Sequence, residues 1–200
     1  REQVNLARQR CEGLPVTIKL MDYRRLTGTF DRIVSVGMFE HVGLPHFDTY
    51  FASVHDLLVP DGIALIHTIG RCERPGTTSP WIAKYIFPGG YVTALSETTH
   101  AIEGQNLFTT DVEIWRLHYA ETLKHWHDRF MANIDKARAL YDDRFCRMWR
   151  FYLAAAEMTF RHRGQVVFQI QLCLDQRAVP LTRDYITESE RALTATDVAA

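Results

Sequence analysis

The sequence lacks the long apolar runs, paired cysteines and charge excess that mark several common classes of protein. Its longest apolar stretches, such as residues 62–66 and 166–170, are far too short to span a bilayer. The four cysteines stand far apart without a C-x-x-C pair, which argues against a disulfide framework or zinc knuckle and favours a reducing, cytoplasmic location. A net charge of −1 at pH 7 offers no overall basic field for nucleic acid. We therefore expect one compact intracellular domain without a nucleic acid partner.

The sequence also lacks a glycine-rich phosphate-binding turn. Doubly wound cofactor domains normally open with a strand and such a turn, which brings the N-terminus of a helix close to the ligand. No G-x-G-x-x-G cluster occurs, and Gly89-Gly90 lies in an aromatic stretch rather than between a strand and a helix. Either the fold is not of the nucleotide-binding type, or the segment that carries the turn is missing from this chain.

The apolar periodicity predicts alternating helices and strands in the first third of the chain. The predicted elements are a helix at 2–11, strands at 16–20 and 30–36, a helix at 47–58 and a strand at 63–69. Between the last two, Pro60-Asp61-Gly62 is a strong turn signal. Apolar strands that alternate with helices predict an open α/β sheet.

The rest of the chain continues this pattern after residues 70–110, which are rich in Pro, Gly and aromatic side chains. We expect a strand near 112–117, a long helical region at 121–163 that breaks at 141–143, and a strand at 166–174. Residues 177–200 show little periodicity. The chain therefore divides into a folded domain at 1–175 and a C-terminal tail at 176–200.

Residues 30–43, F-D-R-I-V-S-V-G-M-F-E-H-V-G, resemble the strand-four region of cyclopropane fatty acid synthases, which include the mycolic acid cyclopropane synthases. Further motifs follow in the family's order and approximate spacing, at 47–51, 66–70, 80–90, 118–123, 144–148 and 165–168. The resemblance covers roughly residues 2–174. In this family the glycine-rich cofactor turn lies just before the helix expected at 2–11. The resemblance therefore implies a member that lacks its N-terminal part.

The family resemblance implies a fold and an activity. The fold is α/β, a class I S-adenosylmethionine-dependent methyltransferase with a Rossmann-like sheet, N-terminally truncated, with a helical insertion or lid. The activity is addition of a methylene across the cis double bond of an unsaturated phospholipid acyl chain, which forms a cyclopropane fatty acid. Two alternatives remain open. Close relatives add a methyl branch instead, and the chain as given could be an inactive fragment or binding module.

The resemblance also implies a catalytic group built around bicarbonate, which is thought to act as the base in this family. The matching bicarbonate-binding and catalytic residues are Glu40, His67 and Tyr119, with the backbone of Ile69 as a further contact. Taken without the resemblance, Glu40 could equally cap a turn, His67 could be a core histidine on a buried strand, and Tyr119 could be half-buried at a strand-to-helix junction.

Four residues match positions that contact S-adenosylmethionine in the family. Asp22 and Tyr23, at the end of the strand expected at 16–20, correspond to the adenine contacts, although an ordinary strand-end turn is the competing interpretation. Val36 and Gly37 are expected beside the methionine part of the cofactor, because glycine permits close backbone approach. The spacing of Glu40, His41 and His46 matches no zinc signature, so no metal is expected.

Several features bear on the lipid and on association. Residues 80–90 could form a wall of the acyl-chain tunnel, with Lys84 near a lipid phosphate, or could equally be core packing. The basic clusters at 144–150 and 161–163 could face an anionic membrane, but such charges more often lie on a solvated helix face. We expect peripheral, transient contact with the inner face of the membrane. The missing strands would leave an exposed sheet edge, which predicts a possible homodimer by strand exchange.

Overall fold

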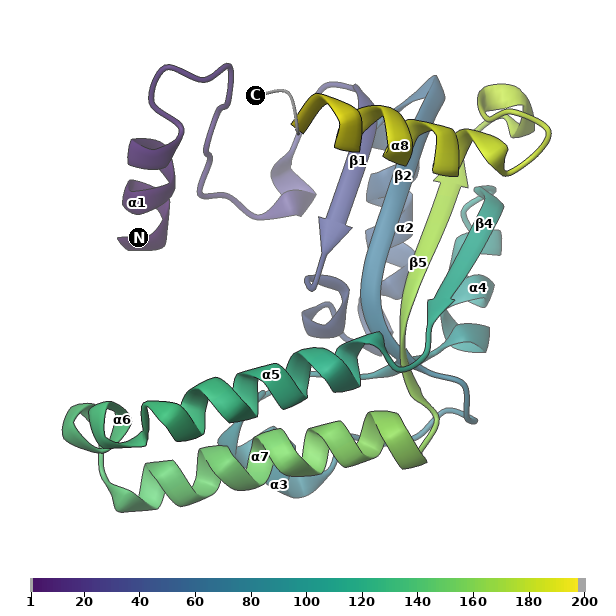
Figure 1. Cartoon of the computed structure of the whole chain (residues 1–200). Helices are drawn as coiled ribbons and strands as arrows, with labels where there is room; N and C mark the ends of the chain where they lie inside the picture. Colours follow the sequence, from purple (N-terminus) through teal and green to yellow (C-terminus); the bar gives the residue numbers. More distant parts are fainter. Residues whose placement is uncertain (1, 198–200) are drawn as a thin grey trace.

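A mixed β-sheet forms the centre of the molecule, in a computed structural model that describes residues 2–197. The strands are β1 (Phe30–Val36), β2 (Leu58–Arg71), β3 (Thr93–Ala94), β4 (Phe108–Trp115) and β5 (Gln165–Cys173). The long strands lie in the order β1-β2-β5-β4 (Figure 1). The short strand β3 pairs with the last residues of β2, beyond those that pair with β1. β1 is parallel to β2, whereas β5 is antiparallel to β2 and β4. The predicted α/β sheet is confirmed.

The predicted turn before the central strand takes the form of a bulge. Phe30 pairs with Leu58 and Arg32 pairs with Ile63, so Pro60-Asp61-Gly62 lies between two registers of the same strand pair. The proline cannot donate a ladder hydrogen bond, and this interruption accommodates it.

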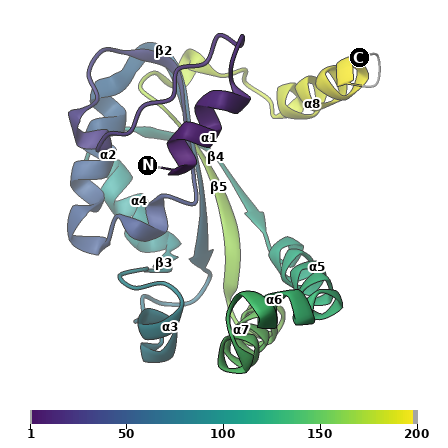
Figure 2. The same ribbon diagram turned by 90° about the vertical axis from the view of Figure 1, so that its left-hand side faces the viewer.

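Two helices cover one face of the sheet (Figure 2). They are α2 (Phe47–Leu57) and α4 (Leu95–Glu103). The buried residues of α2 recur at helical spacing and belong to the core cluster that packs on the sheet: Phe47, Tyr50, Phe51 and Val54. The helix predicted at 47–58 is therefore confirmed. No element was predicted at α4, where Glu97 stabilises the first turn by accepting from the backbone N–H of Ala94 at 2.8 Å.

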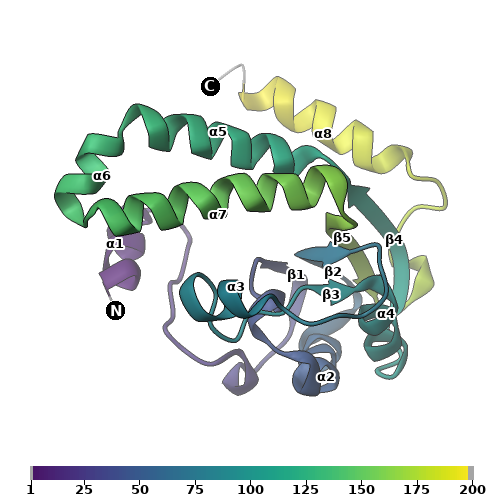
Figure 3. The same ribbon diagram turned by 90° about the horizontal axis from the view of Figure 1, so that it is seen from below.

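A helical hairpin lies across one end of the sheet. It consists of α5 (His118–Ala132), α6 (Ile134–Leu140) and α7 (Asp143–His162). Leu123, Leu153 and Phe160 form its buried seam, and Arg161 joins the long helices through Glu121 at 2.9 Å. The short helix α3 (Pro80–Tyr85) lies beside α7 (Figure 3). The predicted break at 141–143 is confirmed, and a second break occurs at Asn133 between α5 and α6.

The N-terminal part stands beyond the outer edge of β1 (Figure 1). Helix α1 (Glu2–Arg10) buries none of its residues, and Arg8 donates to the carbonyl oxygen of Ile18 at 3.2 Å. The strand predicted at 16–20 is wrong, because these residues form no regular element in the structure. A strand needs a pairing partner, and none of the strands in the described part of the chain lies beside this segment.

The C-terminal segment contains a helix, so the expectation of an irregular tail is wrong for most of it. Helix α8 (Asp184–Asp197) lies at the opposite end of the sheet from the hairpin (Figures 1 and 2). Arg183 forms an ion pair with Asp111 of β4, and the Gln171 side-chain amide of β5 donates to the Tyr185 hydroxyl at 2.6 Å. These polar contacts, rather than an apolar stripe, attach the helix to the sheet. Within residues 2–197, none of the helices is both long and apolar enough to cross a bilayer.

The short 3₁₀ helices occupy the connections. They are η1 (Tyr23–Arg25), η2 (Phe39–His41), η3 (Leu44–His46) and η4 (Gln176–Ala178). The first two carry residues that were predicted to function, and they lie close to the carboxyl end of β1.

Candidate functional site

Glu40 is placed by the way the chain leaves β1. The strand ends at Val36, and Gly37 turns the chain with a φ of +65° while its N–H still donates to the His67 carbonyl oxygen at 3.1 Å. Phe39, which is 1% exposed, anchors η2 in the core. Glu40 then faces the next part of β2, and its Oε1 accepts from the backbone N–H of Ile69 at 2.7 Å.

The second carboxylate oxygen of Glu40 is the most informative atom of the site. Oε2 is buried and has no hydrogen-bond partner among the described residues. Leaving a buried acceptor unpaired is costly, particularly on a charged group, and such atoms call for an explanation. A small ligand with a donor group would satisfy Oε2.

The structure brings six of the eight predicted site residues together around one cavity of about 960 Å³. They are Val36, Gly37, Glu40, His67, Ile69 and Tyr119. Away from these residues the wall is largely apolar, with contributions from α3, α5 and α7, and includes Trp81, Ile82, Phe87, Leu123, Phe151, Ala155 and Phe160. An apolar cavity with a few convergent polar groups has the character of a site for a lipid-like molecule.

The aromatic segment at 80–90 both lines the cavity and packs in the apolar core. Trp81 and Ile82 line the cavity and also pack against the apolar cluster of the hairpin, with Trp81 against Phe151 at a ring-centroid distance of 4.9 Å. Lys84 does not line the cavity, and its ammonium lies 5.2 Å from the ring centroid of Tyr85.

His67 and Tyr119 approach the cavity from different elements. His67 lies on β2, where its Nδ1 is 3.1 Å from Gln169 Oε1 and Trp115 meets the ring edge-on at 5.8 Å. Tyr119 lies in the first turn of α5, and burial followed by the negative charge of Glu40 raises the pKa of its hydroxyl. Tyr119 and Glu40 both line this cavity.

The backbone of Ile69, which was predicted to contact bicarbonate, lines the cavity and already has a partner within the chain. Its N–H is occupied by Glu40 at 2.7 Å, so the amide holds the carboxylate in place instead of offering a free donor to a ligand. A bicarbonate would receive this amide only if Glu40 released it. The backbone of Ile69 therefore positions Glu40 in the present arrangement.

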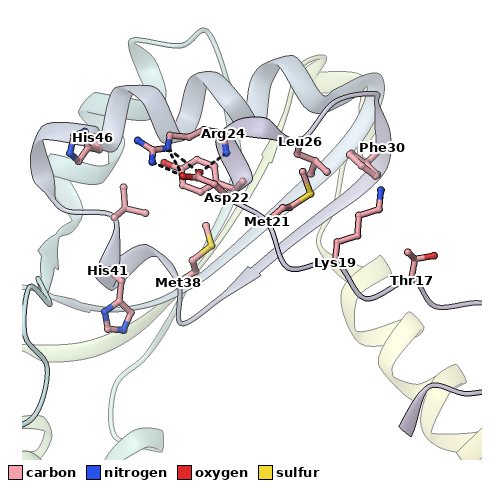
Figure 4. A pocket seen from close by; sticks show the side chains of 12 residues that line it. Thr17, Lys19, Met21, Asp22, Arg24, Leu26, Phe30, Met38, His41 and His46 are labelled. Carbon is pink, nitrogen blue, oxygen red and sulfur yellow. Dashed lines mark hydrogen bonds and ion pairs between the residues drawn. The ribbon is translucent and has the colours of Figure 1, made fainter. Parts of the chain in front are cut away.

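Asp22 and Tyr23 lie in a second cavity, of about 970 Å³ (Figure 4). Asp22 caps η1 by accepting from the Arg24 backbone N–H at 3.0 Å, and it also pairs with the Arg24 guanidinium at 2.5 Å. These hydrogen bonds lower the pKa of Asp22 to about 2. Val36 and Gly37 line the first cavity, and Asp22 and Tyr23 line the second. The predicted cofactor contacts are therefore divided between two cavities, and His41 lines both.

The sequence did not point to Gln169 and Trp115, which contact His67. The available signal was weak. Gln169 and Gln171 interrupt an otherwise apolar strand at spacing two, which places them on one face of the sheet. Which residue they oppose depends on the β2–β5 register, and that register becomes visible only in the structure.

Comparison with known proteins identifies the family. Residues 1–170 match the family described as mycolic acid cyclopropane synthetase. The chain belongs to this family. It is 44% identical over 169 residues to the cyclopropane-fatty-acyl-phospholipid synthase of Escherichia coli K12, covering 84% of this chain and 44% of that protein. It is 41% identical over 179 residues to the tuberculostearic acid methyltransferase UfaA1 of Mycobacterium tuberculosis, covering 84% of this chain and 42% of that protein.

Solved structures support the same assignment. The cyclopropane synthase MmaA2 of M. tuberculosis superimposes with a TM-score of 0.79 at 26% identity, and covers 86% of this chain and 66% of its own. The mycolic acid cyclopropane synthase CmaA1, in complex with SAH and CTAB, gives a TM-score of 0.77 at 27% identity, with the same coverage. The fold is that of the S-adenosylmethionine-dependent methyltransferases. The chain spans less than half the length of these two curated relatives.

Proposed function

We propose that this chain provides the acceptor site of an S-adenosylmethionine-dependent C-methyltransferase that converts a cis double bond of a phospholipid acyl chain into a cyclopropane ring. The observation that carries the proposal is the buried, unpaired Oε2 of Glu40 in the wall of an apolar cavity. His67 and Tyr119 line the same cavity. An acyl chain needs the apolar wall, and a reaction through a cation needs one compact anionic or basic group beside it.

The residues of both cavities fit S-adenosylmethionine. The backbone at Val36 and Gly37 lines the larger apolar cavity, and no heavy atom lies within 4 Å of where a Cβ of Gly37 would be, so a ligand can approach the backbone. Asp22 and Tyr23 would contact the adenosine part from the neighbouring cavity. When bound, the cofactor supplies a methyl group on a positively charged sulfur, which is electrophilic enough for a poorly nucleophilic alkene.

The residues around Glu40 also fit bicarbonate. The O–H of bicarbonate would donate to Glu40 Oε2, the atom that lacks a partner. The Tyr119 hydroxyl can donate to a bicarbonate oxygen, and the His67 ring can accept or donate a hydrogen bond. When bound, bicarbonate supplies a base for the proton that leaves the new methyl group. The carboxylate of Glu40 stabilises the positive charge that forms on the acyl chain.

The balance of the overall reaction agrees with this site. The alkene gains one carbon and two hydrogens from the transferred methyl, and the third hydrogen leaves as a proton. The ring closes when the electrons of the broken C–H bond form the last C–C bond. We place the enzyme at the cytoplasmic face of a membrane, in peripheral contact, because its substrate is a phospholipid.

A methyl-branching reaction is the alternative within the family. The observation that favours it is the 41% identity to the tuberculostearic acid methyltransferase. Both reactions pass through the same addition of methyl to alkene, and they differ in how the cation is quenched. Both reactions start from an unsaturated acyl chain, so the apolar wall of the cavity fits either of them.

The test is a product assay on a chimaera in which this chain replaces the matching segment of the E. coli synthase. The purified chimaera is incubated with S-adenosylmethionine and vesicles of an unsaturated phospholipid, and the fatty acids are analysed by mass spectrometry. We expect a product heavier by one CH₂ that resists mild hydrogenation, as a cyclopropane does. A product of that mass that takes up hydrogen supports the branching alternative. A folded chimaera that binds the cofactor but leaves the acyl chains unchanged contradicts both.

A further inference from the structure

We propose that Gln169 and Glu113 are positioning residues that set the tautomer of His67, so that Nδ1 carries the proton and Nε2 presents a bare lone pair. The inference rests on the proposed function, in which His67 contacts the bound base. Beyond that function, it assigns to Gln169 and Glu113 the control of which ring nitrogen of His67 can accept a hydrogen bond.

The three side chains form a row across the sheet. His67 of β2 pairs in register with Gln169 of β5, which pairs with Glu113 of β4, so all three project from the same face of the sheet. His67 Nδ1 lies 3.1 Å from Gln169 Oε1, and Gln169 Nε2 donates to Glu113 Oε2 at 2.9 Å. The row is a continuous chain of hydrogen bonds.

Glu113 fixes the direction of that chain. An ionised carboxylate can only accept hydrogen bonds, so it selects the NH₂ group of the Gln169 amide. The reversed amide would set its carbonyl oxygen against the carboxylate. With the NH₂ group held by Glu113, the carbonyl oxygen of Gln169 faces His67 and can only accept. His67 Nδ1 must therefore be the donor, and in the neutral ring Nε2 has no proton.

The consequence for the site is a fixed acceptor. His67 lines the cavity, and because Gln169 occupies Nδ1, Nε2 is the ring nitrogen left for a ligand. A bare Nε2 would be a second acceptor beside Glu40 Oε2, available for the second O–H that a bicarbonate gains when it takes up the proton. The opposite tautomer would point an N–H at the same place. Trp115 further restricts the ring through its edge-on contact at 5.8 Å. Oriented partners of this kind commonly set the tautomer of a functional histidine.

The experiment reads the tautomer directly. The ¹⁵N-labelled chain is studied by long-range ¹H–¹⁵N correlation of its imidazole rings, at a pH high enough that the His67 signals no longer change. His67→Asn assigns the signals among the nine histidines. We expect His67 Nε2 to resonate as an unprotonated nitrogen and Nδ1 as a protonated one. A proton on Nε2 in the unchanged chain overturns the proposal.

Variants test whether the row sets the tautomer. Gln169→Leu removes the acceptor, and Glu113→Gln allows the amide of Gln169 to turn, so each should give mixed tautomers. The exchange of both residues, Glu113→Gln with Gln169→Glu, again places an acceptor against Nδ1 and should restore the bare Nε2. Gln171→Leu is the matched control, since Gln171 lies on the same strand and face but contacts Thr110 and Tyr185.

The outcomes separate this inference from the proposed reaction. An Nε2 that stays bare in both Gln169→Leu and Glu113→Gln shows that the row does not set the tautomer. If Gln169→Leu fails to fold, Glu113→Gln and the exchanged pair decide, because Glu113 is exposed. In the chimaera, Gln169→Leu should lower kcat on the order of tenfold with the phospholipid KM unchanged. The tautomer is read without substrate, so failure of ring formation would leave that result intact.

Discussion

At the residue scale, Gly37 determines where the chain leaves β1. Its φ of +65° is a conformation that residues with a Cβ adopt at a cost, and its N–H completes the pairing with β2 by donating to His67. No heavy atom lies within 4 Å of an added Cβ, so a side chain would cause backbone strain without a clash. The turn at Gly37 delivers Glu40 to the amide of Ile69.

Gly37→Ala should lower the free energy of unfolding by about 1 kcal/mol, the usual cost of a left-handed residue with a Cβ. Urea unfolding followed by circular dichroism measures the change. Gly104→Ala is the matched control, because Gly104 has a φ of −62° and an added Cβ would make an ordinary contact at 3.5 Å. Equal losses for the two variants would show that φ at residue 37 carries no strain.

The same scale shows what the sequence could predict about the site. Glu40 and His67 were predicted from the family resemblance, because by position alone Glu40 could equally cap a turn and His67 could be a core histidine. The engagement of Asp22 by Arg24, two residues further on, was not considered, although short-range pairs of this kind are common in turns. Gln169 was missed because cross-strand neighbours depend on register, which a single sequence does not contain.

At the scale of elements, the pairing of β2 with β5 depends on a position in β2 that has no room for a side chain. Gly70 lies on β2 opposite the ring of Phe168, and an added Cβ would lie 2.1 Å from Phe168 Cε2. Phe168 is fully buried beneath α2 and α4, so its ring has little room to move. The strand pair that carries His67 and Gln169 therefore depends on a glycine three residues after His67.

Gly70→Ala should destabilise the protein by about 2 kcal/mol, the usual cost of overpacking a core. Phe168→Leu removes the atoms that clash, so the double variant should lose less stability than the sum of the two single variants. Thermal unfolding of the four proteins forms the cycle. Strict additivity would indicate that the added methyl group does not meet Phe168.

The elements that sequence predicted correctly are those with strong local signals. The periodic apolar residues of α2 and the mainly apolar stretches of β2 and β5 indicate their own type of structure. The strand expected at 16–20 failed because a strand depends on a partner elsewhere. Helix α8 was missed because its attachment is polar, through Arg183 and Tyr185, rather than through an apolar stripe.

At the scale of the whole molecule, β1 is an edge strand whose outer edge has no paired strand in the described structure. Val34 and Val36 of β1 are 66% and 65% exposed, and β1 has a paired neighbour on one side. Unpaired strands with exposed apolar residues tend to associate.

We therefore expect the isolated 200 residues to self-associate through β1 or to bind S-adenosylmethionine weakly. Size-exclusion chromatography with light scattering measures the first, and calorimetric titration with S-adenosylmethionine or its demethylated product measures the second. A monomer with submicromolar affinity for the cofactor would contradict this expectation. It would show that the surfaces at Asp22 and Gly37 form a complete cofactor site.

The most direct test of the central claim compares the chimaera with its Glu40→Gln variant in the same lipid assay. Glutamine keeps the size of the side chain and can accept from the Ile69 amide, but it loses the negative charge and presents an NH₂ group where Oε2 lacks a partner. The account predicts folded protein with unchanged cofactor binding and a rate of ring formation lowered by about 10² or more. Ring formation at the original rate would contradict the assignment of this cavity as the reaction site.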